Sequence, residues 1–285
     1  MSGLTLSGLL VVMLALAFVS VKWLASLDER GFVGRFGTPL AFGAWVLAFW
    51  QVLCDALEVP RVLLPSPAVI GHALLVSLPV LADDFAQTVL HSVVIGLLVG
   101  CALGFVVGVL IDRSPFLQRG LLPLAALASA VPLIGIAPIM VMWFGFDWHS
   151  KAAVVVIMTF FPMLVNTLAG LGETGHMERD LMRSYGASYW RTLFALRIPV
   201  ALPFVFNALK INSTLALIGA IVAEFFGSPV AGLGFRISTE AARLNMGLVW
   251  AAILVAALAG SVLYGLLGWL ERRVTFWHPS IRSGG

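Results

Sequence analysis

The passage "ERDLMRSYGASYWRTLFALRIPVALP", Glu178–Pro203, is rich in charge and lies between long apolar stretches. Its apolar and charged side chains recur at helical spacing, which predicts an amphipathic helix over residues 178–195 with arginines on one face and leucines and aromatics on the other. Pro199 and Pro203 are expected to end this helix before the next apolar segment.

Two interpretations of this amphipathic helix are open. It can rest on lipid headgroups at the membrane surface, or it can dock a partner protein in the cytosol. The triplet Gly186-Ala187-Ser188 favours docking, because small residues allow close backbone approach and a tight bend.

The rest of the sequence is more apolar than that of a water-soluble domain. Apolar residues make up 60% of the 285 residues and charged residues 11%, against roughly 25% charged residues in soluble domains. A helix needs about 20 mostly apolar residues to cross a membrane. The sequence therefore predicts an all-α integral membrane protein. The candidate spans are seven apolar segments, at residues 4–25, 39–57, 86–111, 120–145, 151–171, 203–225 and 247–270.

Lysine and arginine predict the orientation of these segments, because both gather on the cytoplasmic side of a membrane. With the C-terminus in the cytoplasm, twelve basic residues lie inside and four outside, while Lys210 lies within a segment. The basic excess thus reflects a lipid bilayer and gives no reason to expect nucleic acid as a partner.

The first apolar segment needs a separate interpretation. Residues 4–25 start without a basic side chain and show no clear cleavage site, so we expect a retained anchor whose N-terminus lies outside. We accordingly divide the chain into residues 1–38, an extra N-terminal transmembrane helix with a short basic connector, and residues 39–285, the main membrane domain.

Polar residues within the apolar segments are candidates for a transport path, because they are costly to place in a membrane. The segment at 120–145 carries three prolines, and such a broken helix either lines a path or is merely kinked. A hydrogen bond to loop backbone is the alternative role for Glu224, and Lys210 is near enough to the inner surface to reach it. The candidate path residues are the polar Asn166, Asn207, Asn212, Ser213 and Glu224, together with Met140 and Trp143 as an apolar or aromatic contact for a ligand, for which interface anchoring and packing are the alternative.

Small residues recur every four positions in the third segment, at Gly96, Gly100, Gly104 and Gly108. This spacing lets two membrane helices approach closely. Ordinary helix packing is one interpretation, and a surface along which helices slide during gating is the other.

The sequence gives little support for an enzyme. It contains no Walker-type phosphate loop, so ATP hydrolysis by this chain is not expected. The five histidines are scattered, and the two cysteines lie inside apolar spans, so neither a metal site nor a disulfide framework is indicated.

The charged passage resembles the cytoplasmic EAA loop in membrane subunits of bacterial ABC importers. That pattern is E-A-A, three residues, Gly, nine residues and I-x-L-P. Here it reads Asp180-Leu181-Met182, Gly186 and Leu196-Arg197-Ile198-Pro199, so the glycine, the proline and every spacing agree, whereas Leu and Met replace the alanines. The resemblance places an ATPase-coupling loop at about residues 172–202. Its residues are Asp180, Leu181, Met182, Tyr185, Gly186, Ala187, Ser188, Tyr189, Trp190, Leu196, Ile198 and Pro199.

Further motifs extend the resemblance over about residues 39–280 and make the chain similar to the nitrate, taurine and aliphatic-sulfonate permease group. They are "LLPSP" at 63–67, "MWFGFDWHSKAAVVV" at 142–156, "FFPMLVNTLAG" at 160–170 and "GLGFRI" at 232–237. The sixth span lacks the Ala-Trp pair usual in sulfonate permeases, which favours the branch for thiamine-pyrimidine precursors and riboflavin.

The resemblance implies a six-helix type I permease core, to which the segment at 4–25 is extra, in a bacterial inner membrane. It further implies a homodimer of permease chains, two cytosolic subunits that bind ATP and Mg, and an extracytoplasmic solute-binding protein. This chain itself then needs no cofactor. A secondary transporter and a structural membrane subunit are the alternatives, and co-purification with an ATPase distinguishes them.

Overall fold

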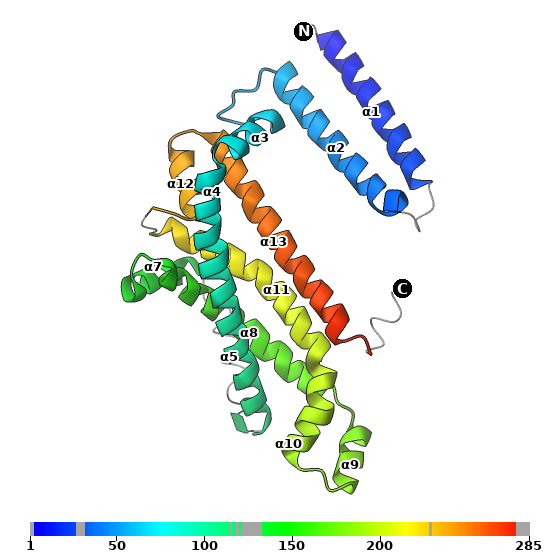
Figure 1. Ribbon diagram of the computed structural model, residues 1–285, viewed down its shortest axis with the longest axis vertical. Helices are drawn as coiled ribbons and strands as arrows, with labels where there is room; N and C mark the ends of the chain where they lie inside the picture. The colour runs from blue at the N-terminus through cyan, green and yellow to red at the C-terminus, as the bar shows by residue number, and fades with distance from the viewer. Residues whose placement is uncertain are drawn as a thin grey trace. The chain divides into compact units, whose positions relative to one another are not determined.

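The computed structural model describes residues 3–26, 32–114, 116–117, 120, 133–227 and 230–277. Every regular element within these ranges is a helix, which confirms the predicted all-α fold (Figure 1). Among the described residues, five helices are long and apolar enough to cross a membrane. They are Gly37–Ala56, Leu78–Asp112, Trp148–Gly172, Tyr189–Phe225 and Met246–Val274.

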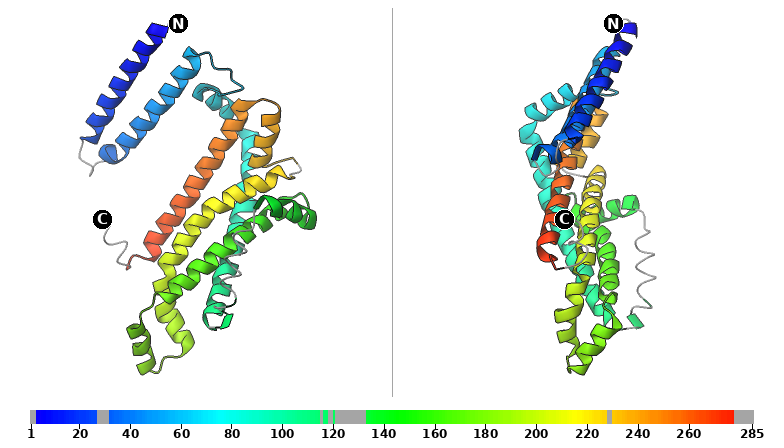
Figure 2. Two further views of the ribbon diagram at one scale, coloured as in Figure 1. Left: turned by 180° about the vertical axis from the view of Figure 1, so that it is seen from behind. Right: turned by 90° about the vertical axis from the view of Figure 1, so that its right-hand side faces the viewer.

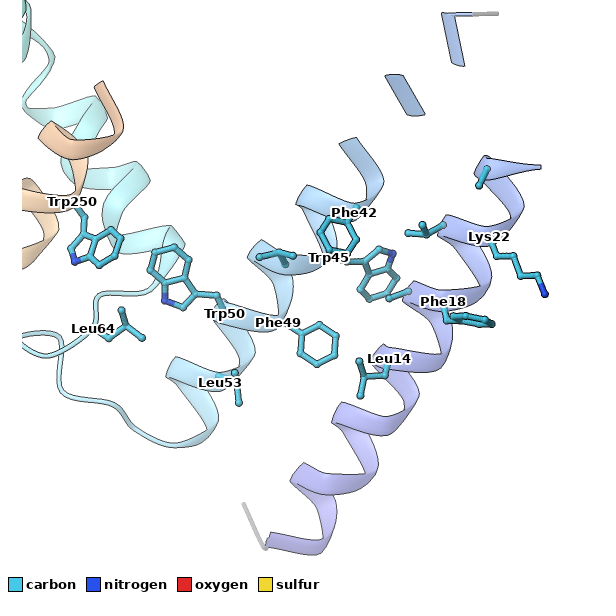
Figure 3. Close-up of a pocket in the computed structure, with 14 residues that line it drawn as sticks. Leu14, Phe18, Lys22, Phe42, Trp45, Phe49, Trp50, Leu53, Leu64 and Trp250 are labelled. Atoms are coloured by element: carbon cyan, nitrogen blue, oxygen red, sulfur yellow. The ribbon is translucent and has the colours of Figure 1, made fainter. Parts of the chain in front are cut away.

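The chain forms two compact units, and the first comprises residues 1–78 with 239–251. It contains α1 (Gly3–Ala25), α2 (Phe32–Ala56) and α3 (Pro67–Val76). Trp45 Nε1 of α2 donates a hydrogen bond to Ser20 Oγ of α1 over 2.9 Å. Aromatic side chains of both helices line an apolar cavity of about 940 Å³ in this unit (Figure 3).

The second unit, residues 79–238 with 252–285, contains the main core. Its central helix, α8 (Trp148–Gly172), packs along both α5 (Ile95–Asp112) and α11 (Ile198–Phe225). The unit also contains most of a further long helix, α13 (Met246–Val274). Shorter helices complete it. They are α4 (Leu78–Phe85), α7 (Leu133–Phe144), α9 (His176–Ser184) and α10 (Tyr189–Thr192), together with most of α12 (Leu233–Ala242).

The contact between α5 and α8 depends on the glycines of α5. Gly96, Gly100, Gly104 and Gly108 are all buried. A Cβ atom built on Gly96 would lie 2.6 Å from Val155 Cβ, and one on Gly104 would lie 2.5 Å from a backbone oxygen of α8. Only residues without a side chain allow the two helices to approach this closely.

Two helices continue through wider π-helical turns. The π-helix η1 (Ala86–Val94) joins α4 to α5, and η2 (Leu193–Arg197) joins α10 to α11. The expectation that Pro199 and Pro203 end a helix is therefore wrong, because the helix runs from Tyr189 to Phe225. A local π turn compensates for the donor that Pro199 lacks, as occurs in membrane helices.

Part of the proline-rich segment at 120–145 lies outside the described residues, including Pro123 and Pro132. The described part is α7, which contains Pro138. In both views of Figure 2, α9 and α10 lie at the end of α8 and α11 opposite to α12. These two ends hold the candidate functional groups.

Candidate functional site

The charged passage folds as two helices, α9 and α10, joined by a turn at Tyr185–Ser188. The predicted single helix over residues 178–195 is therefore wrong. Gly186 has a φ of +68°, a left-handed conformation that favours glycine and ends α9.

The turn is a Schellman motif followed by an N-cap. Gly186 N–H donates to the Arg183 carbonyl over 2.9 Å, and Ala187 N–H donates to the Met182 carbonyl over 3.0 Å. Ser188 then caps α10 by accepting from Arg191 N–H over 3.4 Å. Gly186-Ala187-Ser188 thus stops one helix and starts the next.

A buried arginine holds this turn region to the ends of two long helices. Arg197 of η2 donates to both carboxylate oxygens of Asp112, at the end of α5, over 2.5 and 2.9 Å. It also donates to the carbonyl of Leu171, near the end of α8, over 2.9 Å. Because a forked, largely buried pair is stronger than an exposed one, Arg197 holds the junction of η2 and α11 against the ends of α5 and α8.

Further basic side chains stabilise the same end. Arg179 of α9 donates to the Gly172 carbonyl over 3.1 Å. The Arg113 guanidinium lies over the rings of Tyr189 and Trp190, 5.6 and 5.8 Å from their centroids. Cation–π contacts of this kind hold the aromatic side chains of α10 in place.

Several aromatic and aliphatic side chains of this end are exposed. Tyr185 is 80% exposed, Phe194 65% and Leu181 56%, and Met177 and Trp190 are exposed as well. Such an apolar patch beside charged residues is typical of a protein interface. We call these five residues the outward apolar patch.

The remaining predicted coupling residues lie around this patch. Asp180 is exposed and pairs with Arg183 over 3.2 Å. Met182, Leu196, Ile198 and Pro199 are half-buried, because they sit where the loop meets the long helices. The structure therefore brings all twelve predicted residues to one end of the second unit.

The opposite end is organised around a buried aspartate. Asp84 is fully buried and accepts from Arg236 Nε over 2.7 Å and from the backbone N–H of Gly232 over 2.8 Å. Gly232 has a φ of +136°, and a Cβ there would lie 2.6 Å from the Glu224 carboxyl carbon. Glycine is thus required by both conformation and space.

Glu224 and Thr88 extend this network. The Glu224 carboxylate accepts from Thr88 Oγ1 and from Gly234 N–H, both over 2.7 Å. Thr88 Oγ1 in turn accepts from Leu233 N–H over 2.8 Å. Side chains from η1 and α11 therefore satisfy first N–H groups of α12. We call Asp84, Thr88, Glu224 and Arg236 the α12-end cluster.

The candidate path residues fall into two groups. Glu224, Asn212, Ser213 and Met140 are buried, and Asn212 Nδ2 donates to the Thr159 carbonyl over 2.8 Å. Trp143 and Asn207 are exposed, whereas Asn166 is half-buried and donates to the Pro162 carbonyl. Glu224 accepts from the backbone N–H of Gly234, in the first turn of α12, within the glycine-rich stretch that follows α11.

Several important residues were not identified from the sequence. Asp112 and Arg197 are separated by 85 positions, and Lys210 pairs with Glu271 over 2.8 Å across 61 positions. Lys151 is buried and donates to the carbonyls of Phe146 and Asp147. The usable signal was charge at the ends of apolar spans, as at Asp112, but the sequence does not specify the partners.

Comparisons with known proteins agree with this architecture. Residues 93–276 match the family described as binding-protein-dependent transport system inner membrane component. The chain is 32% identical to a probable ABC transporter permease protein of Haemophilus influenzae, with 82% of this chain and 95% of that protein covered. It is 31% identical to a formylaminopyrimidine transport permease protein of Halalkalibacterium halodurans, with 84% and 95% covered.

The fold also occurs in a solved transporter. A chain of the methionine ABC transporter MetNI, determined in inward-facing conformations, aligns with a TM-score of 0.60 and 18% identity. The alignment covers 70% of this chain and 98% of that chain, so the shared fold includes nearly the whole of the solved chain.

Proposed function

Because this chain belongs to the family of inner-membrane components of binding-protein-dependent transport systems, we propose that its α9–α10 end is the surface through which a cytosolic ATPase drives solute import. The chain is the permease component of an ABC importer for small solutes, and its family implies ATPase and solute-binding partners. The docking proposal rests on the outward apolar patch. The buried hydrogen bonds of Arg197 and the turn at Gly186, whose positive φ favours glycine, hold this patch in position.

The exposed and buried sides of this end have separate roles in the proposal. Tyr185, Leu181 and Phe194 contact the ATPase, while Arg197 transmits movement to the ends of α5 and α8 through Asp112 and the Leu171 carbonyl. The partner subunit binds ATP and Mg, and hydrolysis takes place there. Rigid transmission requires the loop to keep its shape, which the Schellman motif at Gly186 provides.

Three features of the assembly belong to the same proposal. The α9–α10 end and the C-terminus lie in the cytoplasm, in agreement with the distribution of basic residues. Two copies of the chain form the transport unit, and an extracytoplasmic binding protein delivers solute at the α12 end. The proposed solute is a neutral heterocycle of the thiamine-pyrimidine precursor or riboflavin kind, supported by the name of the Halalkalibacterium relative.

The docking role is tested with a matched pair of glycine variants. A Cβ atom added at Gly186 or at Gly172 would meet open space, but only Gly186 has a positive φ. Gly186→Val therefore distorts the turn, whereas Gly172→Val does not. We expect Gly186→Val to insert normally into the membrane and to lose at least tenfold of the ATP hydrolysis stimulated by the binding protein in proteoliposomes.

The control variant Gly172→Val should keep near-normal stimulated hydrolysis. Full activity of Gly186→Val would contradict the docking proposal. Uptake by the wild-type chain that needs an ion gradient and no ATPase subunit would instead identify a secondary transporter.

A further inference from the structure

A groove between α11 and α13 is lined by hydroxyl groups at the middle of both helices. Its volume is about 420 Å³, within the range of roughly 300–1,000 Å³ usual for small-molecule sites. The two helices converge toward the end where Lys210 of α11 pairs with Glu271 of α13 (Figures 1 and 2). The groove is lined by Thr214, Leu217, Ala257, Gly260, Ser261 and Tyr264.

The hydroxyls of this groove differ from those elsewhere in the spans. Thr159, Thr167 and Ser213 each donate to a backbone carbonyl of their own helix. In the part of the chain that the structure describes, Thr214, Ser261 and Tyr264 make no side-chain hydrogen bond, and all three are exposed. Unsatisfied polar groups are costly in hydrocarbon, so these hydroxyls indicate a path for water or a polar ligand.

Charges near the groove cancel each other. Lys210, one helical turn before Thr214 on α11, pairs with Glu271 of α13 over 2.8 Å. The lining itself carries no charge, so the groove has no unpaired cation that would attract an anion. The remaining walls are apolar. Among them is the ring of Tyr264, on which a planar ligand can stack.

We propose that this groove is a substrate subsite of the translocation path that takes a neutral, planar, hydrogen-bonding heterocycle. The inference rests on the proposed function, because it deepens the import path by naming Thr214, Ser261 and Tyr264 as substrate-binding residues. None of these three residues belongs to the path set expected from the sequence. Leu217 and Gly260 approach closely and bound the groove. A Cβ atom built on Gly260 would lie 3.0 Å from Leu217 Cδ2.

Thiol labelling tests the groove without requiring transport. Ser261 lines the groove, whereas the neighbouring Val262 is 60% exposed and lies outside it. In purified full-length chain in lipid nanodiscs, Ser261→Cys should react with a polar maleimide at least tenfold faster than Val262→Cys. Millimolar 4-aminopyrimidine should slow only the Ser261→Cys reaction, and the native Cys54 and Cys101 are buried. Equal labelling rates, or no protection, would overturn the subsite.

Uptake by the complete transporter tests the ligand class. The probes are an aminopyrimidine, riboflavin, taurine and nitrate, supplied with ATP and the cognate binding protein. Tyr264→Phe and Ser261→Ala should each raise the KM for the neutral probe about threefold to tenfold, the usual contribution of one hydrogen bond, while stimulated ATP hydrolysis stays within twofold of wild type. Val262→Ala serves as the control and should change neither value.

Each outcome has a definite meaning. An unchanged KM in both hydroxyl variants, or uptake of taurine and nitrate alone, would overturn the subsite while the importer function stands. Failure of the wild-type chain to associate with an ATPase would instead contradict the proposed function, and the labelling experiment would still decide whether the groove binds the neutral probe.

Discussion

The helical rod at residues 78–112 carries an aspartate near each end, and each aspartate pairs with a distant arginine in different surroundings. Asp84 is enclosed by the α12-end cluster and also accepts a backbone N–H. Asp112 pairs with Arg197 at the end of the unit that carries the α9–α10 turn, where aromatic side chains remain exposed. One end thus satisfies its polar groups within the chain, while the other anchors a surface that still lacks a partner among the described residues.

This difference separates stability from coupling. Removing one partner of a buried pair leaves an uncompensated charge, which destabilises the fold wherever the pair lies. At the α12 end, this loss of stability is the only consequence that we expect for the isolated chain. At the α9–α10 end, a change also displaces the outward apolar patch, so ATPase stimulation is the more sensitive measurement.

The largest effect on stability is expected at the α12 end. Asp84→Ala leaves the Arg236 guanidinium and the Gly232 N–H without their acceptor, and we expect a loss of about 3–5 kcal/mol in the free energy of unfolding. Denaturant unfolding in mild detergent, followed by circular dichroism, measures it. Asp180→Ala, which breaks the exposed pair with Arg183, should lose about 0–1 kcal/mol. Similar losses of unfolding free energy in the two variants would contradict the proposed difference between the α12 end and the α9–α10 end.

An intermediate effect is expected in the rod that connects the two ends. Gly100 faces Thr159 and Val156 of α8, where a side chain has no room, whereas Gly43 of α2 has open space around it. Gly100→Leu should lower stability by about 1–3 kcal/mol through overpacking, and Gly43→Leu should leave it nearly unchanged. If α5 slides along α8 during gating, Gly100→Leu also loses ATP-driven uptake. Normal uptake with normal assembly would leave close packing as its only role.

The smallest effect on stability is expected at Arg113. Arg113→Ala removes the cation that lies over Tyr189 and Trp190 and should cost about 0.5–1 kcal/mol, while stimulated ATP hydrolysis falls severalfold because α10 loses its support. Arg273, 5.4 Å from the Trp269 ring centroid, offers a contact of the same kind away from the turn. Arg273→Ala should show the same small loss of stability with normal hydrolysis. Equal hydrolysis in both variants would show that the Arg113 contact has no special part in coupling.

The sequence contained enough information for five of the seven predicted spans and for the place of the turn at Gly186. Hydropathy reports burial in lipid directly, so segments such as 151–171 and 247–270 agree with α8 and α13. The motif spacing around Gly186 located the turn, but helical periodicity alone did not reveal that the glycine adopts a positive φ and divides the helix. The prediction from Pro199 was wrong because a π turn compensates for the backbone N–H donor that proline lacks.

The polar networks were beyond such reasoning for a physical reason. Asp84, Thr88, Glu224 and Arg236 lie at positions far apart in the chain, and nothing local to any of them specifies the others. The same holds for Thr214 and Ser261, which line one groove only because the fold brings α11 and α13 together. Glu224 was recognised as unusual because a carboxylate in an apolar span is costly, yet its partners required the fold.

The link between Asp84 and Arg236 joins residues 152 positions apart, which has a consequence for how the protein is made. At about 5–20 residues per second, a ribosome needs about 8–30 s to add the residues that separate them. During that interval the Asp84 carboxylate has already been synthesised, but neither Arg236 nor the Gly232 N–H exists to donate a hydrogen bond to it. The nascent chain must therefore keep this acidic group solvated until the last fifth of the sequence emerges, and the insertion machinery or water at the headgroups has to solvate it in the meantime.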